Sequence, residues 1–381
     1  MSAFDLSEEY EELRASVRRL AEDRIAPNAV AADEDEQYPW ASWKAWQAAG
    51  FAGLAFPAAY GGQDGGVLAH AIAVEEVARV CASSSLFTFI SKLAMTPVLA
   101  HGSQHLKDTY VARVAAGEAQ ASYCLSESEA GSDVANMQTR AVRDGEHYVL
   151  TGSKHWITNA GVSDYYTVFA KTDADAAHRG ISVFVVESSF PGFSIGKLEH
   201  KMGVRGSPTG EVVLDRCIVP AANLIGEEGR GFHYAMGALD GSRPLVGAQA
   251  LGIAQGALDL AVAYVGERRQ FGRSLAEFQG LQFMLADMAT EVDAARLLVY
   301  RACARLDTGH PDTGAPSSMA KLFASDTAMR VTTDCVQLLG GLGYTKDAPA
   351  ERFMRDAKIT QIYEGTNQIQ RVVIAKRLLG G

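Results

Sequence analysis

The chain has 381 residues, 48% of them hydrophobic and 21% charged, and a formal net charge of −10. This length predicts two or three domains, and the acidic balance argues against nucleic-acid binding, which needs a basic surface. Residues 1–9 are acidic, and the longest apolar stretch, residues 51–60, is too short for a bilayer, so we expect neither a signal peptide nor a membrane span. Five scattered cysteines without a Cys-x-x-Cys pair predict reduced thiols, no metal site and a cytoplasmic protein.

Residues 1–119 are predicted to form an α-helical domain. Ser7 precedes two glutamates and an apolar stripe of Leu13, Val17 and Leu20, a spacing that predicts a capped helix start. Residues 70–80 and 86–100 are predicted to be mostly buried helices, because the apolar residues of the second go beyond a single stripe.

The middle of the chain, residues 120–228, changes to short β-branched and aromatic runs separated by turn residues. Runs at 147–150, 165–170, 181–186 and 211–214 predict a small antiparallel β domain. Helical periodicity returns in residues 229–381, at 232–239, 245–268, 281–306, 317–339 and 369–379, and such long segments with short links predict an antiparallel helical bundle. The expected fold class is therefore α+β, mainly α.

Several polar segments suit either a structural or a functional role. Small hydroxyl side chains beside glycine, as in Ser126 to Ser132, form polar turns most often, but they also suit close contact with a ring or a phosphate. The pair Glu364-Gly365 places a carboxylate beside bare backbone, where a flat cofactor or a thioester can approach. No Gly-x-Gly-x-x-Gly follows a predicted strand, so a Rossmann-type nucleotide site is not supported.

Ordinary structural roles also fit the remaining segments. Trp156 and Thr158 suit a strand, and Asp240 or Ser242 suits the N-cap of a long helix. Two arginines at 268 and 269 suit the negative end of a helix dipole.

Taken together, the segments 123–133, 152–159, 240–244, 268–279, 337–341 and 356–371 resemble those of the acyl-CoA dehydrogenases, and the resemblance extends over nearly the full chain. It implies a helical N-terminal domain, a central antiparallel β domain and a C-terminal four-helix bundle. It also implies FAD-dependent removal of hydrogen from Cα and Cβ of an acyl-CoA thioester, giving the trans-2-enoyl thioester.

The resemblance assigns a role to individual residues. Glu364 occupies the position of the base that takes the α-proton; related enzymes with a relocated base carry it near the Ser242 position, where this chain has no glutamate. FAD contacts are implied for Tyr123, Leu125, Ser126, Ser132, Trp156, Ile157, Thr158, Arg268, Gln270, Phe271, Gln279, Gln337, Leu338, Gly340, Gly341, Thr366 and Gln368. Acyl-CoA contacts are implied for Ser132, Asp240, Ser242, Arg243, Tyr363 and Gly365.

The resemblance also implies partners. In the family the positions of Arg268, Phe271 and Gln279 reach FAD on a neighbouring subunit, which implies a homo-oligomer, usually a tetramer, and electrons pass to an electron-transfer flavoprotein. Ser128-Glu129 departs from the Pro-Gly that the family often has, which affects the path of that loop. We expect the bulky Phe87 and Phe89 to limit the substrate to short or branched acyl groups, with core packing of both rings as the alternative.

Three alternative functions remain. An acyl-thioester oxidase would pass electrons to oxygen, but such members are generally longer. The acyl carrier can be an acyl carrier protein in place of CoA. A catalytically silent acyl-binding scaffold would be expected to lack Glu364, the Trp156–Thr158 pair or the glycines at 340 and 341, all of which are present.

Overall fold

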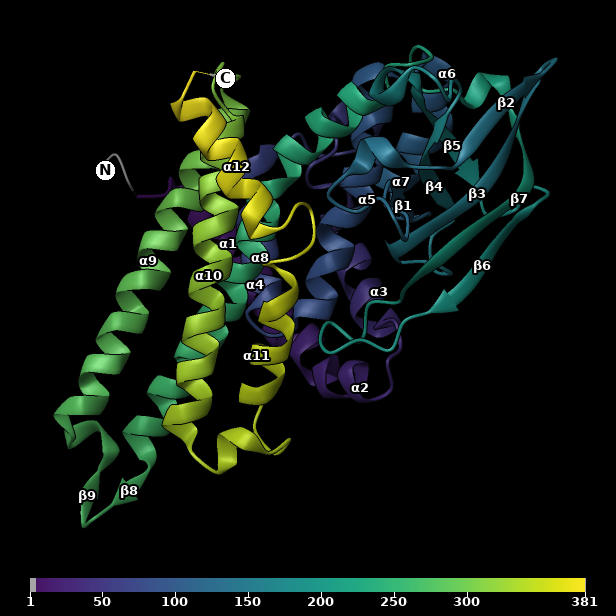
Figure 1. The fold of residues 1–381 in the computed structure, drawn as a ribbon. Coiled ribbons are helices and arrows are strands. Elements are labelled where there is room, and N and C mark those ends of the chain that lie inside the picture. Colours follow the sequence, from purple (N-terminus) through teal and green to yellow (C-terminus); the bar gives the residue numbers. More distant parts are fainter. Residues whose placement is uncertain (1–4, 381) are drawn as a thin grey trace.

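The computed structural model describes residues 5–380, and it places long helices on one side and a twisted sheet on the other (Figure 1). Met1 to Phe4 of the predicted N-terminal segment, and Gly381, lie outside the described residues. The N-terminal part is helical, as predicted. Its helices are α1 (Glu8–Leu20), α2 (Ala29–Glu34), α3 (Trp40–Ala48), α4 (Gly66–Ala78), α5 (Ala82–His101), α6 (Gln104–Leu106) and α7 (Ala112–Ala115). The predicted cap at Ser7 is confirmed, because its side chain accepts a hydrogen bond from the backbone N–H of Tyr10.

The middle part forms a seven-stranded sheet in the order β1-β4-β2-β3-β7-β6, with β5 also paired to β4. Its strands are β1 (Ala121–Cys124), β2 (Arg140–Asp144), β3 (His147–Thr158), β4 (Tyr165–Lys171), β5 (Ile181–Glu187), β6 (Phe193–Leu198) and β7 (Thr209–Pro220). The sheet is mostly antiparallel, as predicted, but β4 runs parallel to β1 and, at one residue pair, to β2. The chain between β1 and β4 makes the β2–β3 hairpin and then returns beside β1 in the same direction, as a crossover of this length allows.

The two faces of the sheet are both buried, but against different partners. Along β4, Phe169 belongs to a core cluster with Met95 of α5, whereas its neighbour Val168 belongs to a cluster with Leu214 of β7. This alternation follows from the period of two along a strand. Helix α5 therefore covers one face of the sheet, and this contact places the N-terminal helices against the start of β1.

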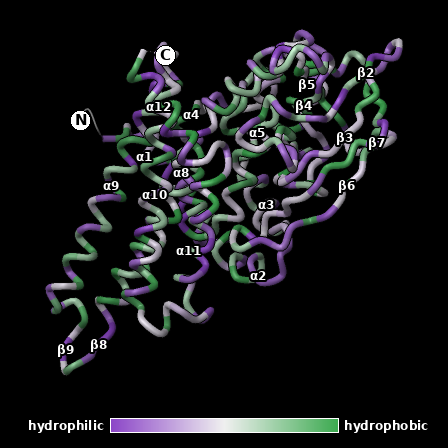
Figure 2. Tube along the Cα trace, viewed as in Figure 1, coloured by the Kyte–Doolittle hydropathy of each residue, from purple (hydrophilic) through white to green (hydrophobic). Residues whose placement is uncertain are grey.

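The C-terminal part consists of long helices joined by short turns. They are α8 (Gly231–Glu267), α9 (Gln279–Asp307), α10 (Gly314–Leu339), α11 (Ala350–Ile359) and α12 (Asn367–Leu378), and a small hairpin of β8 (Arg269–Gln270) and β9 (Arg273–Ser274) links α8 to α9. Figure 2 shows polar and apolar residues alternating along α9, which has one buried stripe. Helix α8 is apolar and long enough to cross a bilayer, but 78% of its most apolar window is buried, as in the core helix of a folded domain.

The predicted helix break at residues 240–244 does not occur, since α8 runs through Pro244 without interruption. Proline removes only the N–H that would reach the carbonyl of residue 240. Pro244 is buried, and Arg243 donates to the carboxylate of Asp240 within the same turn, so packing and a local ion pair offset the lost bond. Val74 of α4, Phe89 of α5 and Leu251 of α8 belong to one core cluster, which fixes α8 against the N-terminal helices.

Candidate active site

A cavity of about 210 Å³ lies where α5, the sheet, α8 and the loop before α12 meet. It brings together eleven of the residues singled out from the sequence: Tyr123, Leu125, Ser126, Ser132, Trp156, Ile157, Thr158, Arg243, Tyr363, Glu364 and Gly365. Its other lining residues are Ile90, Leu93, Gly131, Val134, Met236, Leu239 and Ile369. The cavity thus has hydroxyls and an indole on the sheet side, aliphatic side chains from the helices, and one carboxylate.

That carboxylate belongs to Glu364, in the loop between α11 and α12. Its backbone is left-handed, with φ of 53°, a conformation that costs a non-glycine residue about 1 kcal/mol or more. Ser242 of α8 donates a hydrogen bond to Oε2, whereas Oε1 is buried and has no hydrogen-bond partner among residues 5–380. Burial raises the pKa of Glu364 to about 7, and the Ser242 hydrogen bond and the positive charges of Lys321 and Arg243 offset part of that rise. The group is therefore a base poised near neutral pH with one free oxygen.

The sheet side of the cavity is shaped by an irregularity in β3. The pairing of β3 with β7 shifts register between Lys154 and Ile157, and Trp156 within this shift has a φ of 58°. A bulge of this kind redirects a side chain out of the regular alternation. The indole of Trp156 remains 54% exposed at the cavity, which is unusual for so large an apolar group and suits a stacking partner.

A buried ion pair that the sequence analysis missed supports this wall. Lys154 is fully buried, and its amine lies 2.7 Å from Oε1 of Glu127, the residue after Ser126. Glu127 also accepts hydrogen bonds from the backbone N–H of Gln138 at 2.5 Å and of Thr139 at 3.0 Å. The strand alternation that buries Tyr148 and Leu150 continues to Lys154, so an inward lysine was detectable from the period of two.

Other predicted site residues lie beside the cavity without lining it. Asp240 pairs with Arg243, and Ser242 binds Glu364 instead of capping a helix. Thr366 is the N-cap of α12, since its side chain accepts from the backbone N–H of Ile369 at 3.3 Å. Gln368 is exposed on the first turn of that helix.

Eight predicted FAD contacts lie away from the cavity, at and near the β8–β9 end of the bundle in Figure 1: Arg268, Gln270, Phe271, Gln279, Gln337, Leu338, Gly340 and Gly341. Phe271 is 93% exposed, and a Cβ added at Gly340 or Gly341 would have no atom of residues 5–380 within 4 Å, apart from its neighbours along the chain. Leu338 differs from the others because its side chain is buried in the bundle core, which leaves only its backbone for a ligand. Within one chain these residues do not contribute to the cavity.

The expectation that Phe87 and Phe89 limit the acyl group is wrong for this cavity, because neither ring lines it. Phe87 packs on Trp43, with ring centroids 5.5 Å apart, and on Trp46. Phe89 is buried in the core shared with α8. The alternative of core packing holds for both rings, and Ile90 and Leu93 of the same helix face the cavity instead.

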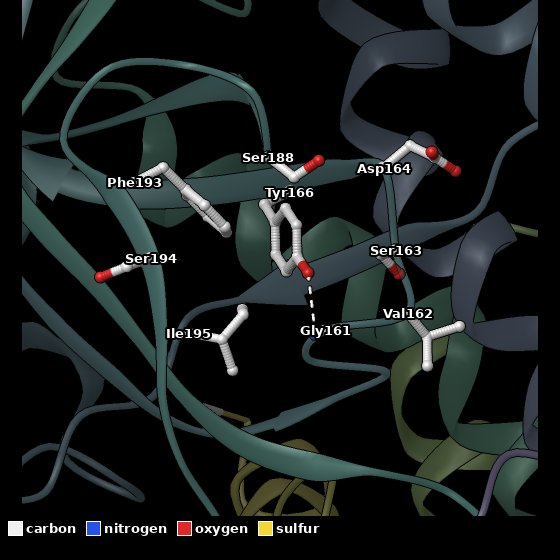
Figure 3. Close-up of a pocket in the computed structure, with 9 residues that line it drawn as sticks. All are labelled: Gly161, Val162, Ser163, Asp164, Tyr166, Ser188, Phe193, Ser194 and Ile195. Carbon is white, nitrogen blue, oxygen red and sulfur yellow. Dashed lines mark hydrogen bonds between the residues drawn. The ribbon is translucent and has the colours of Figure 1, made fainter.

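A second cavity, of about 350 Å³, lies beside β4 and β6, and Figure 3 shows its lining side chains. None of the nine is a histidine, cysteine, lysine or arginine. Its carboxylate, Asp164, accepts from the backbone N–H of Gln120 at 3.0 Å, and the hydroxyl of Tyr166 accepts from the N–H of Gly161 at 3.1 Å. This depression therefore offers little for catalysis, and the chemistry is concentrated in the first cavity.

Comparison with known proteins gives matches along the whole chain. The models of the acyl-CoA dehydrogenase N-terminal, middle and C-terminal domains match residues 7–118, 122–217 and 229–379. The probable acyl-CoA dehydrogenase FadE25 of Mycobacterium tuberculosis is 54% identical, over 99% of this chain and 97% of its own length. Butyryl-CoA dehydrogenase from Megasphaera elsdenii has a TM-score of 0.96 at 40% identity, over 99% of each chain. A chain solved in work on the electron transferring flavoprotein of Acidaminococcus fermentans has a TM-score of 0.97 at 46% identity, over 99% of this chain and 100% of that one.

Proposed function

This chain belongs to the acyl-CoA dehydrogenase family of flavoprotein oxidoreductases, and from that premise we propose that it converts a short acyl-CoA to the trans-2-enoyl-CoA. Glu364 is the proposed base. The observation that carries the proposal is the free, buried Oε1 of this residue in an otherwise largely apolar cavity. A carboxylate whose pKa lies near 7 matches the requirement of a general base at neutral pH.

The proposed reaction removes a weakly acidic proton from the carbon beside the thioester carbonyl. Ser242 holds Oε2, which leaves Oε1 free to receive that proton. Ile90, Leu93 and Leu239 exclude water around the acyl chain, and a dry surrounding strengthens the attraction between the carboxylate and the proton it removes. The electron pair of the broken C–H bond stays on the thioester as its enolate, so the products of this step are protonated Glu364 and the acyl-CoA enolate, which then loses its β-hydrogen.

The residues on the sheet side of the cavity have the chemistry to bind the flavin ring of FAD. The half-exposed indole of Trp156 and the hydroxyls of Ser126 and Thr158 are the groups that we propose hold the flavin ring, because an aromatic face and small donors suit a planar heterocycle. When bound, FAD accepts the β-hydrogen as hydride. We further propose that the far residues, including Phe271 and Gly340, contact the FAD of a second subunit in a tetramer, which their exposure supports.

We propose a short acyl group on the basis of size. The cavity volume of about 210 Å³ is below the roughly 300–1,000 Å³ of pockets that take drug-sized ligands. Because we propose that this cavity also takes the flavin ring, little room is left for the acyl chain. Similarity to butyryl-CoA dehydrogenase supports the same conclusion. Equal turnover of butyryl-CoA and palmitoyl-CoA would contradict it. We also propose an electron-transfer flavoprotein as the electron acceptor and a reducing cytoplasm as the location, the latter because Cys81, Cys124, Cys217, Cys303 and Cys335 are all free.

The decisive experiment replaces Glu364 by glutamine. We expect Glu364→Gln to keep FAD and its flavin absorbance and to lose at least ~10³-fold in acyl-CoA oxidation, because the proton acceptor is gone. Glu146→Gln is the matched control, since Glu146 is exposed in the β2–β3 turn, and it should oxidise acyl-CoA at the normal rate. The assay follows anaerobic bleaching of the flavin by acyl-CoA and turnover with a dye acceptor. Retained turnover in Glu364→Gln would place the base elsewhere.

A further inference from the structure

A fully buried lysine lies beneath the loop that carries Glu364. Lys321 of α10 donates one hydrogen bond to the carbonyl oxygen of Gly365 and another to Oδ1 of Asn367, both at 2.9 Å. Within residues 5–380 no carboxylate lies within ion-pair distance of this amine. Lys321 is 0% exposed, and lysine is almost never fully buried unless it is paired. The fold therefore keeps a costly group at this place. One of its acceptors, Gly365, lies in the loop of the proposed base, and the other, Asn367, begins α12 directly after that loop.

The backbone of this loop has an unfavourable conformation that other contacts must stabilise. Glu364 and the following Gly365 both have positive φ, at 53° and 92°. The amide of Gln370 donates to the carbonyl of Gly365 at 2.8 Å and to that of Glu364 at 3.3 Å. Lys321 thus binds the carbonyl of Gly365, and Gln370 binds the carbonyls of both Glu364 and Gly365. A conformation that is unfavourable for a non-glycine residue persists only when its surroundings fix it.

The charge of Lys321 acts on the same loop. The groups that face Glu364 are Ser242 and Arg243 from α8, Lys321 from α10, the adjoining Tyr363, and Tyr123 from β1. Arg243 is already paired with Asp240. Lys321 is therefore the cation that both touches the loop backbone and has no carboxylate partner of its own.

We propose that Lys321 is a positioning residue for the α-proton abstraction: its amine fixes the Glu364–Gly365 backbone, and its positive charge favours the ionised form of the base. The inference rests on the proposed function of Glu364. Burial lowers the pKa of Lys321 to about 7; the negative charges of Glu364 and Asp326 oppose that fall, and the positive charge of Arg243 adds to it. Removing the cation leaves the carboxylate less stabilised and raises the pKa of Glu364, so the acid limb of the pH–rate profile should move to higher pH.

Two substitutions of Lys321 separate its hydrogen bond to the loop backbone from the effect of its positive charge. Lys321→Met removes both, and we expect its kcat to fall about 10²-fold, the loss expected from a misplacement of about 1 Å. Lys321→Gln keeps an amide donor for Gly365 without a charge. Lys321→Gln should retain most of the wild-type kcat at high pH, where Glu364 is ionised. At a fixed pH on the acid side of the profile, its activity should be about tenfold lower than that of the wild type for each unit by which the pKa of Glu364 rises. Ser325→Ala is the matched control, because Ser325 binds Asn367 in the same cluster but carries no charge and does not touch Gly365.

A titration that needs no turnover accompanies the kinetics. The infrared carboxyl band of Glu364, isolated as the difference between the wild type and Glu364→Gln, should titrate at higher pH in Lys321→Gln than in the wild type. Wild-type kinetics and titration in both Lys321 variants would overturn the inference, as would an equal loss in Ser325→Ala with an unmoved acid limb. If Lys321→Met does not fold, Lys321→Gln decides alone. If the wild type oxidises no acyl-CoA, the proposed function is wrong. The infrared titration still tests whether the charge of Lys321 lowers the pKa of Glu364, because it needs no turnover.

Discussion

Replacing Lys154 by methionine tests how the fold holds the sheet side of the cavity. The amine of Lys154 and Oε1 of Glu127 are 2.7 Å apart, and the two side chains are 0% and 8% exposed. Removing one partner of a buried pair leaves an uncompensated charge and costs about 3–5 kcal/mol. The remaining carboxylate keeps donors from Thr139 and Gln138, so we expect a value near the lower end, about 3 kcal/mol.

The loss should also weaken FAD binding. Glu127 follows Ser126 directly, and Lys154 precedes Trp156 by two residues, so the pair joins two of the segments that we propose hold the flavin. The assay is urea unfolding at fixed chain and FAD concentrations, since ligand and assembly both shift apparent stability. A parallel FAD titration measures the affinity.

An exposed pair of the same length provides the control. Lys197 and Glu199 are also 2.7 Å apart, but their side chains are 71% and 29% exposed. Lys197→Met should cost less than about 1 kcal/mol, because solvent screens such pairs. Combining Lys154→Met with Glu127→Gln should recover part of the loss, since the unpaired charge is then removed. The reasoning is refuted if the two lysine variants are equally stable, or if the double variant is as unstable as the sum of the single ones.

Three further predictions concern the base and the exposed end of the bundle. The pKa of Glu364 rises from 4.5 to about 7 on folding, so the native state favours the neutral form; Glu364→Gln should stabilise the protein by about 1–3 kcal/mol at pH 8 and progressively less as the pH falls toward 4.5. Denaturant midpoints that differ equally at pH 8 and pH 5 would contradict this. Ser242→Ala removes a hydrogen bond that lowers the pKa of Glu364, so the acid limb of kcat/KM should move to higher pH, and an unmoved limb would show that the bond is unimportant in the working enzyme. Phe271→Ser should weaken FAD binding and assembly, measured by FAD titration and light scattering, whereas Val142→Ser on exposed β2 should change neither.

The local features of the fold were predictable where a short pattern determines the structure. Ser7 and the stripe after it gave the correct start of α1, and the β-branched runs located β4 and β5. The parallel pairing of β1 with β4 was not predictable, because four residues of β1 gain their partner from a strand about 40 positions later. The helix break predicted at Pro244 was wrong for a related reason. The position of Pro244 inside α8 depends on packing that no local sequence pattern contains.

In the candidate site, too, some features were predictable from the sequence and others were not, and the difference has a physical cause. A motif identifies Glu364, Trp156 and Ser126 as chemical groups, but a glutamate becomes a base near neutral pH only when burial raises its pKa. That burial, and the left-handed backbone that aims the side chain, depend on contacts across long stretches of chain, such as Lys321 with Gly365 and Ser242 with Glu364. Lys321 has no distinguishing neighbours in the sequence and is informative only because it is buried. The reacting group, Glu364, can therefore be predicted from the sequence, whereas the side chains that support it can be identified only from the folded structure.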